Sequence, residues 1–282
     1  MSRQAVLFTP GDRFDMLGKG LTSGADTVVF DIEDAVAPQA KDQACENIVS
    51  YLSEIDANDI DTEICIRINQ LGYRGIRDLE AIASVSDKFD SIMLPMIDDV
   101  GAIEILVQKL GYEGIDANII AVIETPMSVI NLSDIAFHPS VDGIGFGAED
   151  LTTAIGGIHT YDREEVKFAR QKVVIATSAA GIDAIDMGWP DFKDLDGLRK
   201  NTREAVTFGF TGKVAIHPSQ IEVIHEEFTP SEEELEWSQK VVTEADRLKD
   251  EHKVLFQLDG EMIDPPIISR ARMILDRANL DS

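Results

Sequence analysis

The stretch Val28-Val29-Phe30-Asp31-Ile32-Glu33-Asp34 decides the fold, because an apolar run ends there directly in carboxylates. The same change from apolar residues to acids ends the run 119–123 at Glu124 and the run 144–147 at Glu149 and Asp150. Burying a strand that ends in acids is costly unless a positive group lies beside it. The C-terminal ends of neighbouring parallel strands lie together, so these acids would converge on one cation that prefers oxygen ligands.

Eight short β-rich runs follow one another at even intervals, and helical patterns fill most of the gaps between them. The β-rich runs cover 5–8, 27–32, 63–69, 91–95, 118–124, 142–147, 183–186 and 213–217, and the helical patterns cover 39–53, 98–110, 163–180 and 196–209. Eight alternations of strand and helix predict an α/β fold, a (β/α)8 TIM barrel. The competing architecture is a doubly wound sheet. The loose G-x-G-x-x-A at 143–148 does not favour it, because that motif belongs to a first βα unit.

Residues 226–282 exceed what a barrel in residues 1–225 requires. Ser231 and Glu234 form a capping box that begins a helix running to about Lys249. After a break at 253–264, two prolines open a last helix that runs to Asn279. We expect this C-terminal helical extension to pack outside the barrel or to reach over a neighbouring subunit and close that subunit's active site.

The composition excludes several classes of protein. The chain has 282 residues, 44% of them hydrophobic, and no apolar run approaches the ~20 residues of a membrane span, so we expect a cytoplasmic enzyme without a membrane partner. A net charge of −27 argues against nucleic acid as a partner. Cys45 and Cys65 lie in apolar-periodic segments, which predicts buried, reduced thiols.

The acidic surplus, 52 acids against 25 bases, also predicts a halophilic protein. Self-repulsion of this size loosens a compact fold in dilute buffer, whereas near 1 M salt the Debye length falls to ~3 Å and the repulsion is screened. An ordinary acidic enzyme is the alternative. We expect the melting temperature to rise in a series from about 0.1 to about 3 M KCl. A melting temperature that stays constant would contradict the halophilic hypothesis.

Glu124 and Asp150 are the predicted metal ligands. Each follows an apolar strand and would give one oxygen to Mg²⁺, with Mn²⁺ as the alternative ion. The remaining octahedral positions would take water and a bidentate 2-oxo or 2-hydroxy acid. A helix N-cap or first-turn acid is the structural alternative for each, since both precede helix-like stretches.

Arg67 and the acids at 31–34 are further candidates. Strand alternation sends Asp31 and Glu33 to one side and Asp34 to the other, so the three cannot all be ligands. We expect Glu33 and Asp34 to act through metal-bound water and a basic partner, while one of the three acids caps the helix at 39–53. We interpret Arg67, among apolar neighbours, as holding substrate or a developing enolate oxygen; a structural ion pair is the alternative.

Two residues in the eighth β-rich run, Lys213 and His217, bear on which reaction mechanisms are possible. Lys213 opens that run instead of ending it, which argues against a Schiff-base aldolase. His217 ends it, and there a structural role is favoured over catalysis.

Seven blocks of sequence, in order along nearly the whole chain, resemble those of a known enzyme family. They are 7–11, 31–36 with Pro38 and Lys41, 67–69, 123–125, 146–151, 209–213 with 216–220, and 260–266. Together they resemble the citrate lyase β-subunit family of acyl-CoA lyases, HpcH/HpaI-type aldolases that include malyl-CoA and β-methylmalyl-CoA lyases. The resemblance implies a (β/α)8 barrel that forms a homotrimer or hexamer. It also implies Mg²⁺ on Glu124 and Asp150, with Arg67 on the oxoacid or enolate oxygen.

The resemblance adds a role for Asp264 that spacing does not give. It implies that Asp264 reaches from the C-terminal segment into a neighbouring subunit's site as the acid/base. From the residues alone, Asp264 before two prolines is a helix N-cap. For the nucleotide end of coenzyme A the candidates are Lys19 and Lys41. The chain departs from the family at Met96, where many relatives have a basic residue, and at Gln4, where serine is usual.

The reaction that the resemblance implies is reversible cleavage of a 3-hydroxyacyl-CoA into a 2-oxoacid and acetyl- or propionyl-CoA. Malyl-CoA, methylmalyl-CoA and citryl-CoA are the candidate substrates. The N–H groups of Gly147, Ala148 and Glu149 would hold the substrate carboxylate. The alternatives are a malyl-CoA thioesterase or malate synthase, and a citrate lyase β subunit that needs partner subunits.

Overall fold

The computed structural model describes residues 3–56, 60–249 and 255–280. The chain divides into two compact units, Met1–His225 and Glu226–Ser282.

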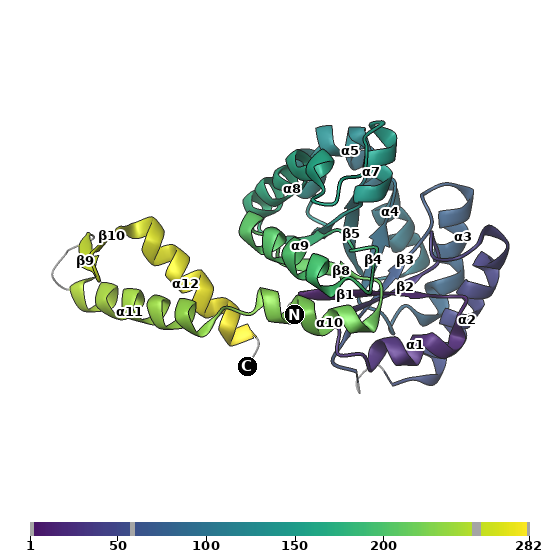
Figure 1. The fold of residues 1–282 in the computed structure, drawn as a ribbon. Coiled ribbons are helices and arrows are strands. Elements are labelled where there is room, and N and C mark those ends of the chain that lie inside the picture. The colour runs from purple at the N-terminus through teal and green to yellow at the C-terminus, as the bar shows by residue number, and fades with distance from the viewer. Residues whose placement is uncertain (1–2, 57–59, 250–254, 281–282) are drawn as a thin grey trace. The chain divides into compact units, whose positions relative to one another are not determined.

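Eight parallel strands close into a barrel in the first unit, and their order around the ring is their order along the chain (Figure 1). They are β1 (Ala5–Pro10), β2 (Thr27–Asp31), β3 (Glu63–Arg67), β4 (Ser91–Leu94), β5 (Asn118–Ile123), β6 (Val141–Phe146), β7 (Asp183–Asp186) and β8 (Gly212–Ala215). Strand β1 pairs with both β2 and β8, which closes the ring. The predicted (β/α)8 barrel is confirmed, and a doubly wound sheet is excluded.

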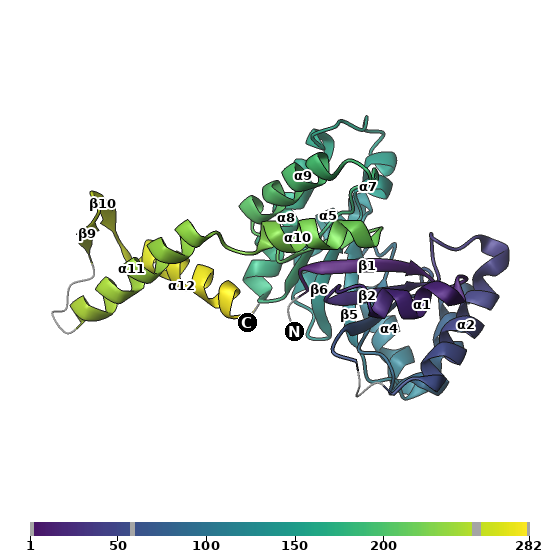
Figure 2. The same ribbon diagram turned by 60° about the horizontal axis from the view of Figure 1, so that its bottom comes forward.

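Helices lie outside the ring of strands, as Figures 1 and 2 show. They are α1 (Phe14–Leu21), α2 (Lys41–Glu54), α3 (Tyr73–Ile82), α4 (Val100–Glu113), α5 (Pro126–Ile130), α6 (Leu132–Ala136), α7 (Ala148–Ala154), α8 (Lys167–Ala180), α9 (Leu195–Phe208) and α10 (Ile221–Phe228). The apolar spacing read in the sequence faces each helix toward the strands. In α2, for example, Ala44, Ile48 and Leu52 recur every four residues and are fully buried.

Helix ends differ from the predicted ones by a few residues for local reasons. Helix α8 begins at Lys167 rather than 163, because a 3-10 turn, Glu164–Val166, precedes it. Helix α4 continues to Glu113, where Gly114 adopts a left-handed conformation with φ of 70° that ends the helix.

Apolar side chains from most of the strands fill the inside of the barrel. The buried cluster contains Val6, Val29, Cys65, Met93, Ile120, Val122 and Ile185. Cys65 thus belongs to the core, and Cys45 is also buried and free, as predicted. Because this layer fills the inside of the barrel, the C-terminal ends of the strands, where barrel enzymes place their active sites, lie above a packed core.

An ion cluster around Arg3 closes the N-terminal end of the barrel. The Arg3 guanidinium donates to Glu63 at 2.7 Å, to Asp142 at 2.7 Å and to Asp183 at 3.2 Å. Ser91 adds a hydrogen bond to Glu63 at 2.7 Å. This cluster joins the starts of β3, β4, β6 and β7 to Arg3, two residues before β1.

The second unit consists of helices α11 (Glu232–Lys249) and α12 (Pro265–Leu280) and the hairpin β9 (Phe256–Leu258) and β10 (Glu261–Ile263). The capping box is confirmed, because the Glu234 N–H donates to Ser231 Oγ at 3.2 Å and the Ser231 N–H donates to Glu234 at 2.9 Å. The hairpin lies in the predicted break at 253–264, of which 253 and 254 are outside the described residues. Within the part of the chain that the structure describes, no helix has the length and apolar composition needed to cross a membrane.

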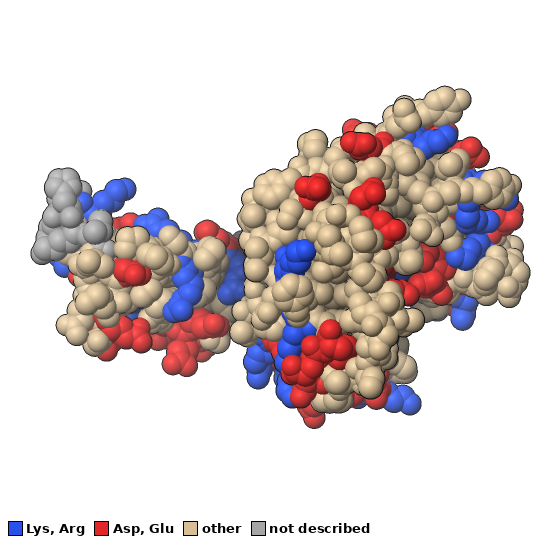
Figure 3. All heavy atoms as spheres, turned by 90° about the horizontal axis from the view of Figure 1, so that it is seen from above, with Lys and Arg blue, Asp and Glu red and all other residues tan. Residues whose placement is uncertain are grey.

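Surface charge is uneven on the barrel. On the face that Figure 3 presents, patches of Asp and Glu side chains lie beside patches of Lys and Arg, with wide areas of other residues between them.

Candidate active site

A cavity of about 420 Å³ opens at the C-terminal ends of the barrel strands. Its acids and Arg67 come from the side of β2, β3, β5 and β6, where apolar residues line it too, whereas the side of β7, β8 and β1 contributes apolar residues and no charged ones. The acidic lining residues are Asp31, Asp34, Glu124, Glu149 and Asp150, and the apolar wall comprises Phe8, Met187, Gly188, Pro190, Val214 and Ile216. The structure therefore brings the predicted acids and Arg67 together at one cavity.

Arg67 is held by two acids of the neighbouring strand end. Residue Asp31 lies opposite Arg67 in the register of β2 and β3, and it accepts the Arg67 Nε–H at 2.8 Å and a second guanidinium N–H at 2.5 Å. Glu33 lies 3.0 Å from the remaining guanidinium nitrogen, and the guanidinium sits 4.7 Å from the centre of the Phe8 ring. A structural ion pair, the alternative interpretation of Arg67, is thus present between Arg67 and Asp31, at the wall of the cavity.

The turn after β2 depends on Asp31 as well. Its oxygens accept the N–H groups of Glu33 at 2.8 Å and Ala35 at 3.0 Å. Among the described residues no side chain caps the start of α2, so the expectation that one of the three acids caps the helix at 39–53 is wrong. Burial raises the pKa of Glu33 to about 7, with Asp34 and Asp31 adding to the rise and Arg67 opposing it. Asp34 is exposed at the cavity.

Glu124 is buried, with 5% of its surface exposed, and its carboxylate is fixed by backbone. The Met96 N–H donates to Glu124 Oε1 at 2.6 Å from a left-handed conformation, with φ of 53°, that is unusual for a non-glycine residue. A methyl group at Gly147 would lie 3.2 Å from Glu124 Cδ and closer to two other atoms of that side chain. Thr125 and Ser128, not Glu124, form the N-terminal cap of α5. Glu124 is therefore free of a capping role and is held rigidly.

Asp150 lies in the first turn of α7, after the N-cap Gly147. Asp150 thus occupies the first turn of a helix, as the structural alternative to a metal-binding role expected, and it also lines the cavity. Burial and the charge of Asp34 raise the pKa of Asp150. Burial, helped by the charges of Asp150 and Glu33, raises the pKa of Glu124 to about 7, against the opposing effects of the Met96 N–H and Arg67.

Mutual repulsion of this kind is what a bound divalent cation relieves, and carboxylate oxygens are the ligands that Mg²⁺ prefers. Among residues 3–56, 60–249 and 255–280, no group of three or more His, Cys, Asp and Glu side chains has the arrangement of a metal site. Two carboxylates suit a hard cation whose other ligands are water and substrate, and not a site closed by protein alone, so Glu124 and Asp150 stay the predicted ligands.

The segment 147–149 differs from expectation at its first residue. The Gly147 N–H donates to the Ile123 carbonyl oxygen at 3.0 Å, so it is not free to hold a substrate carboxylate. The amides of Ala148 and Glu149 lie in the first turn of α7, where a helix lacks internal acceptors. The Glu149 side chain points to Arg163, at 3.0 Å.

The two lysines proposed for coenzyme A lie in different surroundings. Lys19 pairs with Asp15 on the exposed side of α1 at 3.1 Å and does not line the cavity. Lys41 reaches the end of β3, where its ammonium donates to Asn69 Oδ1. Only Lys41 of the two is therefore directed toward the C-terminal ends of the strands.

His217 and Asp264 both have structural partners. His217 Nδ1 accepts the Ser219 N–H at 3.1 Å, and its ring stacks on Phe192 with centroids 4.8 Å apart, as the favoured structural role requires. In the second unit, Asp264 Oδ1 accepts the Ile267 N–H at 3.2 Å and so caps α12.

Sequence reasoning missed the apolar wall. Val214 and Ile216 alternate with Lys213 and Ala215 along and just beyond β8, and this alternation was the available signal that they face the inside. Gly188 carries no such signal, because its role depends on how closely β7 and β8 approach.

The sequence matches the family described as "HpcH/HpaI aldolase/citrate lyase" over residues 4–218. It is 34% identical to mitochondrial citramalyl-CoA lyase of Rattus norvegicus over 293 residues, covering 98% of this chain and 86% of that protein. It is 32% identical to citrate lyase subunit beta of Escherichia coli strain K12 over 289 residues, covering 99% and 94%.

The fold is also similar to a solved structure. The crystal structure of CitE from Mycobacterium tuberculosis in complex with magnesium, acetoacetate and coenzyme A matches with a TM-score of 0.85 and 30% identity, covering 99% of this chain and 98% of that one. Because the family match spans the barrel and the relatives span nearly the whole chain, the protein belongs to the HpcH/HpaI aldolase/citrate lyase family.

Proposed function

We propose that the protein is a Mg²⁺-dependent lyase that reversibly cleaves a 3-hydroxyacyl-CoA into a 2-oxoacid and an acyl-CoA. The observation that carries this proposal is the cavity itself, which sets the buried Glu124, the half-buried Arg67 and the exposed Asp150 against an apolar wall. One side suits a charged oxoacid, and the other suits the carbon chain that the reaction breaks. Relatives named as citramalyl-CoA lyase and as citrate lyase subunit beta support the same class of reaction.

Glu124 and Asp150 are the residues that would hold Mg²⁺, or Mn²⁺ in its place. When bound, the ion would polarise the oxygens of the 2-oxo or 2-hydroxy acid and stabilise negative charge on them. The CitE structure named above is a complex with magnesium and acetoacetate, which supports a divalent ion and a small oxoacid at such a site.

Arg67 would stabilise the enolate oxygen that forms when the carbon–carbon bond breaks. Asp31 and Glu33 hold the guanidinium over the Phe8 ring, 4.7 Å from its centre, and both terminal nitrogens retain a second N–H for a ligand. A fixed donor of this kind costs no reorganisation when charge develops. The amides of Ala148 and Glu149 would hold the substrate carboxylate.

The acid/base would be Asp264 of a second copy of the chain, in a homotrimer or hexamer. It would protonate the thioester enolate to give the acyl-CoA, and in reverse it would take a proton from the acyl methyl or methylene group. Lys41, next to Asn69, is the better placed of the two lysines for coenzyme A.

Arg67→Lys is expected to lower turnover by about tenfold, because an ammonium keeps the charge but loses the planar fork. The control is Asp31→Asn, which loses the same ion pair but keeps the guanidinium. Steady-state kinetics and thermal melting of both variants check this. If Arg67→Lys and Asp31→Asn lose the same amount of activity and the same amount of stability, Arg67 has a structural role only.

A second candidate is a non-catalytic role as a β subunit that needs acyl-carrier and transferase partners, which the similarity to citrate lyase subunit beta favours. The deciding experiment is an assay of the purified protein with Mg²⁺ against malyl-, methylmalyl-, citramalyl- and citryl-CoA. Formation of 2-oxoacid and acyl-CoA supports the lyase. Release of free CoASH instead would indicate a thioesterase or malate synthase, and inactivity that partners restore would indicate a subunit.

A further inference from the structure

The segment Met187–Pro190 forms part of the apolar wall of the cavity, but it extends beyond the end of β7. Side chains bind two of its carbonyl groups, those of Met187 and Trp189. The ammonium of Lys213 donates to the Met187 oxygen at 2.7 Å. The amide of Gln220 donates from Nε2 to the Trp189 oxygen at 2.9 Å. These two bonds flank Gly188, which lines the cavity.

Gln220 joins this segment to the loop after β8. Its Oε1 accepts the Ile216 N–H at 2.8 Å, and the residue is fully buried. One amide thus uses its donor on the β7 side and its acceptor on the β8 side. Pro190 and Ile216, next to these two contacts, line the cavity.

The local sequence explains how Gln220 reaches both loops. The turn Pro218–Gln220 begins at the N-cap His217, and Pro218 occupies the first position, where its missing N–H costs nothing. This turn folds the chain back, so that Gln220 lies beside Ile216, four residues earlier.

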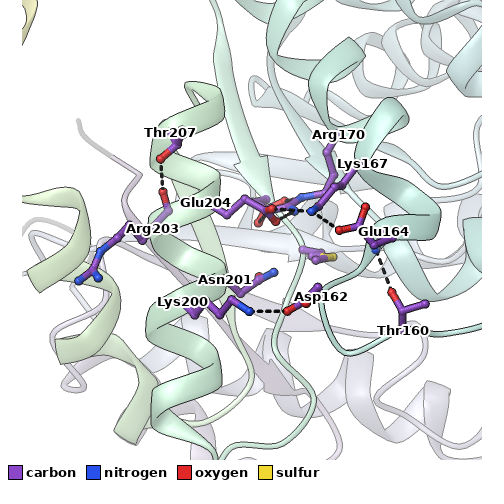
Figure 4. A network of polar contacts seen from close by, with 12 residues as sticks. Thr160, Asp162, Glu164, Lys167, Arg170, Lys200, Asn201, Arg203, Glu204 and Thr207 are labelled. Carbon is purple, nitrogen blue, oxygen red and sulfur yellow. Dashed lines mark hydrogen bonds and ion pairs between the residues drawn. The ribbon is translucent and has the colours of Figure 1, made fainter.

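The β7 side of the wall is anchored independently from behind. Arg170 of α8 donates to Asp186 at 3.0 and 2.9 Å. It also pairs with Glu204 of α9, which Lys167 contacts too (Figure 4). Because β7 is fixed in this way, the gap between the β7 and β8 loops depends on what bridges them.

The two loops are already close at Gly188. An added Cβ there would lie 3.3 Å from Val214 Cγ1 and 3.4 Å from Ile216 Cγ2, tighter than ordinary van der Waals contact. A small change in loop separation would therefore change the shape of the apolar wall.

We propose that Gln220 is a positioning residue that sets the separation of the β7 and β8 loops and thereby the fit of the alkyl part of the oxoacid. Its loss would leave a buried carbonyl and a buried N–H without partners, which favours separation of the loops so that water can reach them. The link to oxoacid fit rests on the proposed function; the bridging role does not.

Gln220→Met keeps the size of the side chain and removes both hydrogen bonds. We expect its dissociation constants for pyruvate and 2-oxobutyrate, measured by calorimetry in saturating Mg²⁺, to rise about tenfold or to lose their wild-type ratio. Mg²⁺ affinity without oxoacid should stay unchanged. Unchanged oxoacid affinity and ratio in folded Gln220→Met would overturn the effect on fit.

If Gln220→Met does not fold, Gln220→Glu provides a second test of the proposal. A protonated Glu donates to Trp189 and accepts from Ile216 as the amide does, whereas a carboxylate has no donor. Oxoacid affinity should therefore match wild type near pH 5.5 and fall about tenfold near pH 8, each value being taken relative to wild type at the same pH, since both proteins carry the neighbouring His217. A ratio to wild type that does not change with pH would contradict the proposal.

Hydrogen exchange separates the bridging role from the proposed function. The Ile216 N–H should lose protection in Gln220→Met and keep it in the control Ser91→Ala, whose lost hydrogen bond to Glu63 lies at the opposite end of the barrel. Unchanged protection at Ile216 would overturn the bridging role. Loss of protection, together with a wild type that binds neither oxoacid, would instead count against the proposed function.

Discussion

Asp150→Asn is expected to lower Mg²⁺ affinity at least tenfold, which is ~1.4 kcal/mol, with little loss of fold. The substitution keeps the shape of the side chain but removes one of the two carboxylates that would hold the ion. It also removes a charge that raises the pKa of Glu124, so stability without metal should not suffer. Calorimetric titration with Mg²⁺, and paramagnetic titration with Mn²⁺, measure the affinity directly.

Glu149→Gln is the matched control for this prediction. Glu149 lies beside Asp150 in the first turn of α7, but its side chain is largely exposed and pairs with Arg163. It should bind Mg²⁺ nearly as wild type does. An unchanged titration in Asp150→Asn, or an equal loss in Glu149→Gln, would remove Asp150 from the metal site.

Asp264→Asn is expected to lower lyase activity by about 10² or more in a folded assembly. The capping contact to Ile267 should survive, because Asn ranks beside Asp at an N-cap. Proton exchange should not, since an amide cannot act as acid or base. Activity, melting temperature and assembly size measured on one preparation separate the two roles.

Mixing the two variants tests whether the site is shared between subunits. Asp264→Asn and Asp150→Asn proteins, dissociated and reassembled together, should regain part of the activity, because some interfaces combine an intact Asp150 with an intact Asp264. Loss of activity without such rescue would contradict the shared site. Near-normal activity in Asp264→Asn alone would leave Asp264 as a helix cap.

The barrel could be predicted because each of its strands is a local pattern. Runs of β-branched and apolar residues bounded by turns appear in the sequence itself, and eight of them separated by helices leave few other topologies. The convergence of Glu124 and Asp150 on one cavity followed from the same rule, since parallel strands end together.

Other features depend on tertiary contacts or on very short elements. The hairpin of β9 and β10 has strands of three residues, too short for a periodic pattern, although Asp259 and Gly260, with φ of 50° and 92°, form the Asp-Gly turn that favours a hairpin. The left-handed Met96 is set by its contact with Glu124, 28 residues away. Gln220 is a polar residue whose burial depends on two loops that no local pattern brings together.

The cluster around Arg3 has a consequence for how the chain is made. The carboxylates that bind Arg3 come 60, 139 and 180 residues later in the sequence. At about 5–20 residues per second, a ribosome synthesises Asp183 roughly 10–40 s after Arg3. Until β7 has been synthesised, the Arg3 guanidinium of a nascent chain lacks Asp183 as a partner. The ion cluster at the N-terminal end of the barrel is therefore completed only late in translation.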